Sequence, residues 1–399
     1  MRKAFLASLL SPRFALSLNA FVGGVVLYRQ FLSGAGEACR SAVNVAAGIC
    51  LRFLHFAPPG PVDPALRPLQ PGRSQVRASL RTALWAIAPC VLVSMLGCSL
   101  KKVAVNQLGN ALAGSSGTTF SSDNDPELIA AAAPFSLKLM ESLLAESPQH
   151  RGLLLATCSG FTQYAYLAVQ EPADELEAHD IAAATTLRKR AGLLYLRARD
   201  YGLRGLETRH KGFASALRKN AKAAVMRCDK RDVAFLYWTA AAWGSAISVS
   251  KESPDLIADQ SIVEALIDRA AALDPDFSDG AIQQFLITYE PARPGGGKDY
   301  EARSLPHFNR AVEISHGQMA GPYVSYAESI SVASQNRAQF ETMLHRALAV
   351  DPDARPEWRL ANLVMQRRAR WLLAREDDLF LDPVDPTAVV GSVDATATP

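Results

Sequence analysis

Apolar residues recur with a helical period along most of the chain from residue 126 onward. Asp125 offers an N-cap, Pro126 suits the first helical position, and Glu127 places an acid in the first turn, so a helix is predicted to begin here. The apolar residues that follow are spaced by four, three, four and four, which predicts one apolar helix face: Leu128, Ala132, Phe135, Leu139 and Leu143. Ser147-Pro148 then restarts the chain before a second helix of the same pattern.

The same pattern continues towards the C-terminus, and it predicts a chain made of helices alone. We expect nine further helices, near residues 174–200, 203–226, 229–250, 255–273, 278–290, 299–315, 320–334, 336–350 and 356–378. Alternation with a period of two, which is typical of half-buried strands, is nowhere sustained. The predicted fold class is therefore all-α.

A degenerate repeat is visible in the C-terminal half. Asp274, Ser315 and Asp351 occupy equivalent helix ends, 41 and 36 residues apart, close to the ~34 residues of a tetratricopeptide repeat. Each is preceded at fixed offsets by an apolar residue, an arginine and a small alanine. We therefore expect residues 126–381 to form antiparallel helix pairs stacked as a tetratricopeptide-like bundle.

The segment before this domain has the order of a bacterial lipoprotein signal peptide. Arg77 and Arg81 precede an apolar stretch from residue 83 to 96, and Gly97 then precedes Cys98. We expect a signal peptide at 77–97, lipidation of Cys98 and a flexible tether at 98–125. The alternative is an ordinary signal peptide or a short membrane anchor that ends near Cys98.

Residues 1–76 and 382–399 lack the periodicity of the domain. Residues 57–72 hold six prolines, and the apolar stretch at 14–28 is interrupted and short for a membrane span. Our hypothesis is that residues 1–76 are an upstream extension, with synthesis beginning near Val76. A cytoplasmic or membrane-proximal extension is the alternative. Residues 382–399 are expected to form a disordered tail.

Charge and composition exclude several classes of protein. Residues 1–97 carry ten Lys or Arg and two Asp or Glu, a net charge of +8, so the remaining residues carry −5 out of the total of +3. A negatively charged domain lacks the basic footprint of a nucleic-acid-binding protein. No apolar stretch of 18 residues has clean flanks, which argues against a polytopic membrane protein.

No motif for catalysis, metal binding or a cofactor stands out. The sequence PGGGKD at 294–299 lacks the first glycine and the Ser or Thr of a phosphate-binding loop, so we interpret it as a connection between helices. The histidines form no metal-ligand spacing, and the acidic pairs are typical of helix ends. Cys158 and Cys228 are interpreted as buried structural thiols, although a disulfide between them is an open alternative.

Two segments are richer in aromatic residues than packing requires. Residues 159–166 and 235–244 combine large aromatic rings with small residues, a composition that can leave a cleft with apolar walls and polar handles. The alternative is the aromatic core of a helical repeat. The candidate ligand-binding residues are Phe161, Gln163, Tyr164, Tyr166, Tyr237, Trp238 and Trp243.

These segments also carry a resemblance to a known family. The chain is similar to the TatT family of helical, tetratricopeptide-like periplasmic lipoproteins associated with tripartite ATP-independent periplasmic (TRAP) transporters. The similar stretches span residues 98–381: Cys98-Ser99-Leu100-Lys101-Lys102 with 103–113, then 134–141, 147–166, 195–206, Tyr237-Trp238, 307–311 with Ser315, and 320–328. The resemblance implies a lipid at Cys98, a homotrimer, and contact with the transporter's solute-binding P component. It brings no catalytic residue and no cofactor.

Two functions follow as hypotheses. The first is a non-enzymatic, lipid-anchored periplasmic accessory of a TRAP transporter that binds the P component and a hydrophobic or organic-acid solute. Ser99 after Cys98 favours the outer membrane for the anchor. The alternative is an envelope scaffold lipoprotein that assembles proteins without a small ligand.

Overall fold

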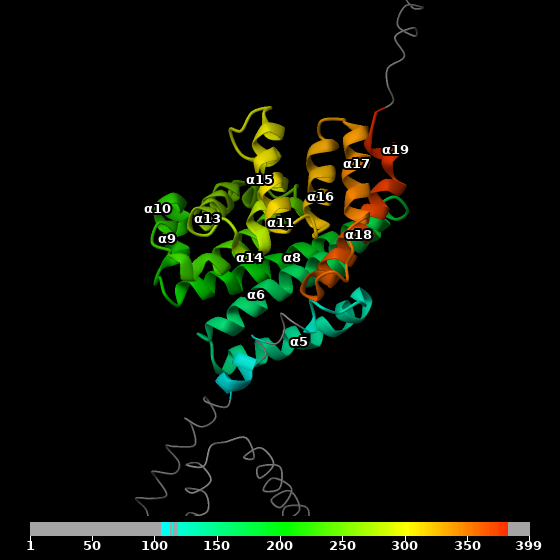
Figure 1. Ribbon diagram of the computed structural model, residues 1–399. Helices are drawn as coiled ribbons and strands as arrows, with labels where there is room; N and C mark the ends of the chain where they lie inside the picture. The colour runs from blue at the N-terminus through cyan, green and yellow to red at the C-terminus, as the bar shows by residue number, and fades with distance from the viewer. Residues whose placement is uncertain (1–104, 112–113, 115–118, 382–399) are drawn as a thin grey trace, which may run out of the picture. The chain divides into compact units, whose positions relative to one another are not determined.

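The computed structural model describes residues 105–111, 114 and 119–381, and the described residues form helices and their connections without a strand. This confirms the all-α prediction. The signal peptide, the lipidated Cys98, the upstream extension and the tail were predicted for residues that lie outside the described ones. Figure 1 shows the order of the helices along the chain.

The longer α-helices of the domain are α5 (Pro126–Glu146), α6 (Arg151–Ala165), α8 (Ile181–Glu207), α11 (Val233–Val249), α13 (Gln260–Leu273), α14 (Phe277–Tyr289), α15 (Tyr300–Ile314), α17 (Arg337–Leu348) and α18 (Arg359–Ala374). Shorter ones lie between them: α7 (Glu171–Leu176), α9 (Phe213–Lys219), α10 (Ala221–Val225), α12 (Pro254–Ala258), α16 (Gly321–Tyr326) and α19 (Glu376–Leu379). Two single turns of π-helix, η2 (Tyr166–Gln170) and η5 (Ala327–Ser331), continue α6 and α16. Three short 3₁₀ turns, η3 (Lys230–Asp232), η4 (Glu290–Ala292) and η6 (Pro356–Trp358), complete the order.

Helix α5 begins where the sequence predicts, but it buries only the C-terminal part of the predicted face, at Leu143 and partly at Leu139. The Asp125 side chain accepts a hydrogen bond from the Leu128 amide at 2.9 Å, which is the predicted N-cap. Leu128 and Phe135, however, are 55% and 75% exposed, and the buried residues are Leu137, Met140, Leu143 and Leu144. Because the first half of α5 is apolar on nearly every side, its periodicity could not select the buried face. Of the described helices, α5 is long and apolar enough to cross a membrane, although its second half packs into the core.

The break predicted between residues 200 and 203 is wrong, because α8 runs without interruption to Glu207. Glycines at 202 and 205 lie inside this helix, where they let α11 approach closely. A Cβ on Gly202 would lie 2.2 Å from Thr239 Oγ1, and one on Gly205 would lie 1.9 Å from the Phe235 ring. The chain leaves α8 afterwards, and Gly212, with φ of 73°, starts α9.

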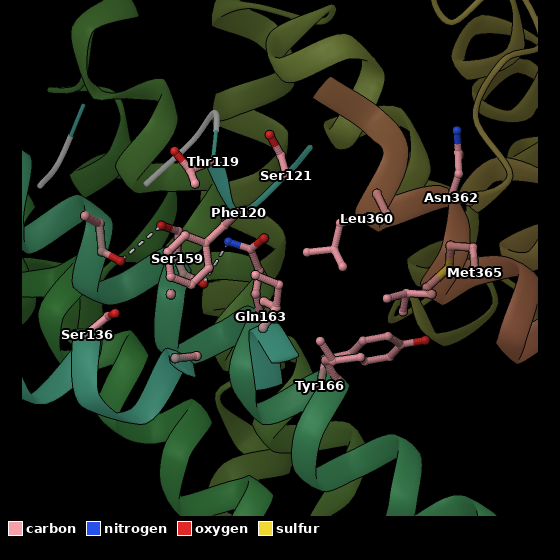
Figure 2. Close-up of a pocket in the computed structure, with 18 of the residues that line it drawn as sticks. Thr119, Phe120, Ser121, Ser136, Ser159, Gln163, Tyr166, Leu360, Asn362 and Met365 are labelled. Carbon is pink, nitrogen blue, oxygen red and sulfur yellow. Dashed lines mark hydrogen bonds between the residues drawn. The ribbon is translucent and has the colours of Figure 1, made fainter. Parts of the chain in front are cut away.

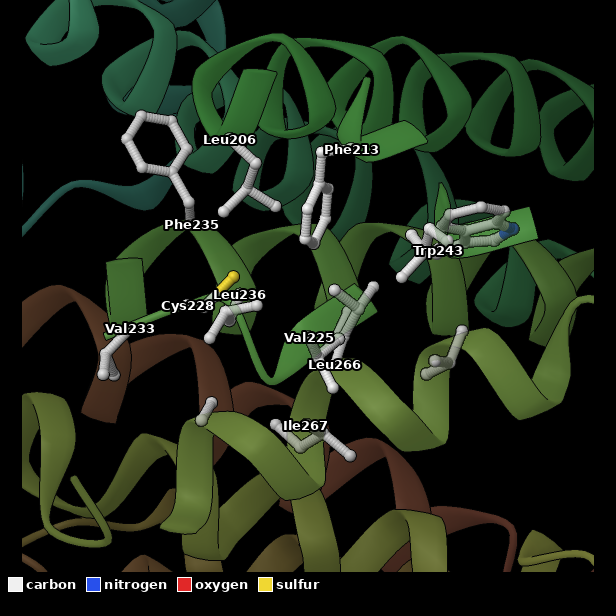
Figure 3. Packing of buried hydrophobic residues seen from close by; sticks show 14 of the residues in the cluster. Leu206, Phe213, Val225, Cys228, Val233, Phe235, Leu236, Trp243, Leu266 and Ile267 are labelled. Atoms are coloured by element: carbon white, nitrogen blue, oxygen red, sulfur yellow. The ribbon is translucent and has the colours of Figure 1, made fainter. Parts of the chain in front are cut away.

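The largest group of buried residues lies where α8, α9, α10, α11 and α13 meet. Figure 3 shows Phe213, Phe235 and Trp243 in the layer between these helices, with Leu266 and Ile267 of α13 closing the other side. A second group joins α15, α16, α17 and α18 and includes the fully buried Phe340. These two clusters hold the helices that form the site described below.

The helix faces predicted from the repeat are confirmed at their buried positions. Asp274 and Ser315 are the C-caps of α13 and α15, and α17 ends at Leu348, shortly before Asp351. The equivalent apolar residues Ile267, Phe308 and Leu344 are all buried, and so are the alanines three positions later, at 270, 311 and 347. The stacking of these helices as tetratricopeptide-like pairs stays a prediction.

Candidate functional site

The first of two neighbouring cavities lies against α5 and α6 and has a volume of about 570 Å³. Its walls are largely apolar, and they include Leu137, Met140, Leu360 and Met365. Phe120, from the segment that leads into α5, covers one side. Figure 2 shows Phe120, Gln163, Leu360 and Met365 around the same opening.

The segment around Phe120 is held onto α18 by its backbone. The Leu360 amide donates to the Ser121 carbonyl at 3.0 Å, and the Arg359 guanidinium donates to the Ser122 carbonyl at 2.9 Å. These bonds fix the position of Phe120 at the first cavity. The chain that enters the domain thereby forms part of the cavity wall.

The second cavity, of about 790 Å³, lies between η2, α8, α11, α14, η5 and α18. One part of its wall is aromatic, with Tyr237, Trp238, Phe285 and Tyr289. The rest carries hydroxyl and amide groups, from Gln170, Tyr195, Ser245, Ser248, Gln284, Thr288, Ser325 and Ser329. Apolar walls with a few polar groups are typical of a small-molecule site.

The two cavities share four wall residues, namely Gln163, Tyr166, Gln284 and Met365. A single layer of side chains therefore separates them. Gln163 is exposed, and its amide donates only to the Ser159 carbonyl of its own helix at 3.2 Å. Rotation of this side chain would break no bond to another helix, so the layer is open to movement at this residue.

Both π-helical turns contribute to the second cavity. Tyr166 and Gln170 come from η2, and Glu328 and Ser329 come from η5. A π turn holds one more residue than an α turn, so it redirects the side chains that follow it, and such turns are frequent at functional sites. Tyr195 donates its hydroxyl to Gln170 Oε1 at 2.6 Å, which fixes the amide of Gln170 in the wall.

An ion pair between a buried arginine and a half-exposed glutamate lies in the wall of the second cavity. Arg368 of α18 is 8% exposed and binds Glu328 of η5 through its Nε and Nη2 atoms. Its Nη1 donates to Asp174 Oδ2 of α7 at 3.0 Å. The neighbouring Arg367 donates to Glu171 Oε2 at 2.5 Å. This network joins α18 to α7 and η5. It also occupies the donors of Arg368, so the charges of Arg368 and Glu328 compensate each other in the cavity wall.

Burial sets the ionisation of the tyrosines in these walls. It raises the pKa of Tyr166 well above 10, and the nearby carboxylate of Glu171 raises it further. Burial also raises the pKa of Tyr237 to about 12. Both side chains are therefore neutral hydroxyls that can donate a hydrogen bond at any physiological pH.

The structure brings four of the seven predicted site residues to the cavities. Gln163 and Tyr166 line both, and Tyr237 and Trp238 line the second, with their two rings edge-on at 5.0 Å. The other three lie elsewhere. Phe161 stacks on Tyr201 at 6.1 Å, Tyr164 binds Arg190 through its hydroxyl at 3.2 Å, and Trp243 is 1% exposed in the core below Arg199.

Sequence reasoning missed the wall residues of the C-terminal half. Gln284, Glu328, Met365 and Arg368 lie in helices whose apolar pattern was interpreted as packing alone. A signal was present at Arg368, because it stands between Met365 and Ala369 on the face of α18 that packs inward. A charged residue at a core position is rarely buried without a partner.

One further cluster brings together metal-ligand residue types. Ligand atoms of His210, Cys228 and Asp232 lie within 4.8 Å of one another. Asp232 accepts from Arg151 at 3.2 Å and from His210 at 2.8 Å, and it pairs with Arg209 at 2.7 Å. Two guanidinium groups already neutralise this carboxylate, so the cluster is better suited to joining α8 to the start of α11 than to holding a cation. Cys228 is buried as a free thiol, as is Cys158.

The described domain matches a known protein family over almost its whole length. A family model for the TRAP transporter T-component matches residues 122–380. The chain belongs to the TRAP transporter T-component family. This match confirms the family resemblance found in the sequence.

One relative covers most of the chain. An uncharacterized protein of Treponema pallidum (strain Nichols) is 32% identical over 327 residues, which make up 76% of this chain and 99% of the relative. The T-component family is an accessory part of a transporter and not a family of enzymes.

Proposed function

We propose that this T-component is a periplasmic, lipid-anchored accessory protein that binds the solute-binding P component of a TRAP transporter. The family match over residues 122–380 carries this proposal. The lipid would be attached at Cys98, with the outer membrane favoured for the anchor. The protein would act as a homotrimer of tetratricopeptide-like domains.

The two cavities support a role in handling the solute. Together they offer a path from the apolar walls beside α5 to the aromatic and hydroxyl-bearing walls beside α11. Because only Gln163, Tyr166, Gln284 and Met365 separate them, a hydrophobic or organic-acid solute could pass from one to the other. Gln163, Tyr166, Tyr237 and Trp238 are the proposed ligand-binding residues.

A substitution at Gln163 tests this role, because its side chain faces both cavities. Gln163→Trp places an indole in the shared layer and should reduce both the binding of an apolar fluorescent probe, N-phenyl-1-naphthylamine, and transport in cells. Gln163→Ala, the matched control, removes the amide without adding bulk and should leave probe binding intact. Since Gln163 is exposed, both variants should unfold at the temperature of the original protein.

The same pair of variants distinguishes the accessory role from the alternative of an envelope scaffold. If Gln163→Trp abolishes probe binding while transport and partner capture stay at the original level, the cavity has no part in function. The protein would then act by assembling other envelope proteins.

A separate experiment tests the anchor. Mass spectrometry of the mature protein should find an acylated N-terminal peptide that begins at Cys98, and Cys98→Ala should prevent processing. A peptide that reads unmodified through Cys98 in the mature protein would contradict lipidation at this residue.

A further inference from the structure

Positive charge is concentrated in one segment of the domain. Residues 186–231, from α8 to η3, hold fourteen Lys or Arg and three Asp or Glu, a net charge of +11. Residues 98–399 as a whole carry −5, so the remainder of that part of the chain carries −16. The part of the chain that begins at Cys98 is therefore negative overall, with its positive charge concentrated in one segment.

Four of these cations are free to meet a partner. Lys211, Lys219, Lys222 and Arg227 are exposed, and none forms an ion pair with a carboxylate of the described residues. They lie in or next to α9 and α10, and Met226, the C-cap of α10, is 65% exposed beside Arg227. We call these five residues the α9–α10 basic surface. Several other cations of the segment are paired, as Arg209 is with Asp229 at 2.8 Å. Three more without an ion pair to a described residue lie in α8, outside this group: Lys189, Arg190 and Arg204.

The chain enters the domain at the N-terminal end of α6. Asn106 Oδ1 accepts a hydrogen bond from the Ser147 hydroxyl at 2.9 Å, and the His150 ring lies 3.3 Å from the Asn106 carbonyl. Gly109 lies against Leu153, since a Cβ there would be 2.8 Å from its Cδ1 atom. These contacts fix the entry point beside the connection between α5 and α6.

The basic segment, residues 186–231, contacts the same end of α6. Arg204 donates to the Pro148 carbonyl at 3.3 Å. Arg151, the first residue of α6, donates to the Gly205 carbonyl at 2.9 Å and to the Arg231 carbonyl at 3.4 Å. The end of α8 and the start of η3, which flank α9 and α10, therefore adjoin the entry point of the chain.

The proposed anchor lies a short distance before this entry point. Seven residues separate Cys98 from Asn106. A fully extended chain spans about 3.3–3.6 Å per residue, so the entry point stays within about 30 Å of the membrane surface. Charged groups feel an anionic surface within a Debye length, about 8–10 Å at physiological salt. The tether therefore keeps the domain close to the membrane, with the end of α8 that leads into α9 beside the entry point.

We propose that the α9–α10 basic surface docks on the anionic phospholipid headgroups of the membrane that holds the anchor. This inference rests on the proposed lipid at Cys98. The short tether supplies proximity, and the unpaired cations supply attraction, while the negative charge of the remaining surface favours the orientation that turns it away from the bilayer. Docking would fix how the domain presents its cavities to the periplasm.

A quenching experiment with the acylated protein tests this docking. The protein is reconstituted into vesicles of phosphatidylcholine, with or without 30% phosphatidylglycerol, that contain a headgroup nitroxide quencher. Met226→Cys carries a bimane label, and the native thiols at 158 and 228 stay unlabelled because they are buried. The label should be quenched on the anionic vesicles and far less on the neutral ones, and 0.5 M salt should remove the difference. A label at Asp377→Cys in α19, which Figure 1 places well away from α9 and α10, should not respond.

Two matched double variants locate the effect. Lys219→Gln with Lys222→Gln removes two lysines of the surface and should weaken docking about 30-fold, since each lysine near an anionic bilayer contributes about a factor of five. Lys189→Gln with Lys298→Gln removes two exposed lysines outside the α9–α10 basic surface, one in α8 and one before α15, that also form no ion pair with the described residues. This control should dock as the original protein does.

Each contrary result has a distinct meaning. Equal quenching on neutral and anionic vesicles, or equal loss in both double variants, would overturn the docking. Quenching that ignores phosphatidylglycerol, together with protection of the label by added P component, would assign the surface to an acidic protein partner. Failure of the protein to float with the vesicles would instead count against the anchor at Cys98, and flotation is measured before any quenching is read.

Discussion

Replacement of Gly205 by alanine should destabilise the domain, although alanine is the better helix former. Gly205 lies inside α8 where α11 crosses it, and an added Cβ would stand 1.9 Å from Cε1 of the Phe235 ring. Ordinary van der Waals contact begins near 3.4 Å. The ring would have to move by about 1.5 Å, and Phe235 is 3% exposed with Arg151 stacked on it at 4.7 Å.

The expected magnitude is the balance of two effects. Overpacking of a core costs about 1–3 kcal/mol, and replacing glycine by alanine in a helix returns about 1 kcal/mol. Because the added Cβ would overlap the ring by about 1.5 Å, the cost lies in the upper part of this range, about 2–3 kcal/mol. We therefore expect Gly205→Ala to lower the free energy of unfolding by about 1–2 kcal/mol. For a domain of this size, that is a fall in Tm of roughly 2–8 °C, measured by circular dichroism or calorimetry.

Gly244→Ala is the matched control, because it changes glycine to alanine inside α11 with room for the added group. Its nearest neighbour would be the Phe285 ring at 3.5 Å. This variant should keep or raise Tm. The double variant Gly205→Ala with Phe235→Leu should be less destabilised than the sum of its parts. If Gly205→Ala is as stable as Gly244→Ala, the close approach of α8 to α11 is not what these glycines provide.

Three further predictions concern buried ionisable groups. Arg368→Gln should lower the free energy of unfolding by about 2 kcal/mol in a denaturant titration, because it leaves the Glu328 carboxylate without its partner, while Asp174 keeps its ion pair with Arg188; an effect below 1 kcal/mol would contradict the network. Burial holds the pKa of His307 below its usual 6.5 in the folded protein. The unfolded chain therefore takes up a proton first as the pH falls, so the domain loses stability between pH 6.5 and the lower pKa of folded His307. His307→Gln should flatten this part of the curve of Tm against pH. Burial raises the pKa of Cys228 to about 12 and also raises that of Cys158, so neither thiol should react with a disulfide reagent at pH 8 until the protein is unfolded in guanidinium; rapid reaction of the folded protein would refute this.

Periodicity predicted the helices well where polar residues mark one face. The ends of α13 and α15 and the buried positions of α17 follow directly from it. It failed on the first half of α5, where apolar residues on every side leave the buried face to be chosen by α6 and the C-terminal helices. It also predicted a break inside α8 that is absent. Gly202 and Gly205 serve the close contact of α8 with α11, and this contact cannot be inferred from the local sequence.

The candidate site was predictable only in part, because its walls are formed by helices that are far apart in the sequence. Aromatic composition drew attention to Gln163, Tyr166, Tyr237 and Trp238, which lie in cavity walls. The same composition also marked Trp243, whose ring the core surrounds. The opposite walls come from α14, η5 and α18, whose wall residues lie more than forty residues further along the chain. No local pattern can show that such helices meet, and the two π turns have no sequence signature of their own.

The measurement that tests the account most directly is affinity capture of the tagged, cross-linked protein from cell envelopes, with mass spectrometry of everything retained. We expect a TRAP-type solute-binding P component among the captured proteins, in amounts comparable to the tagged protein and absent from a capture without cross-linker or tag. Recovery of cell-wall or assembly proteins with no P component would contradict the accessory role and favour an envelope scaffold.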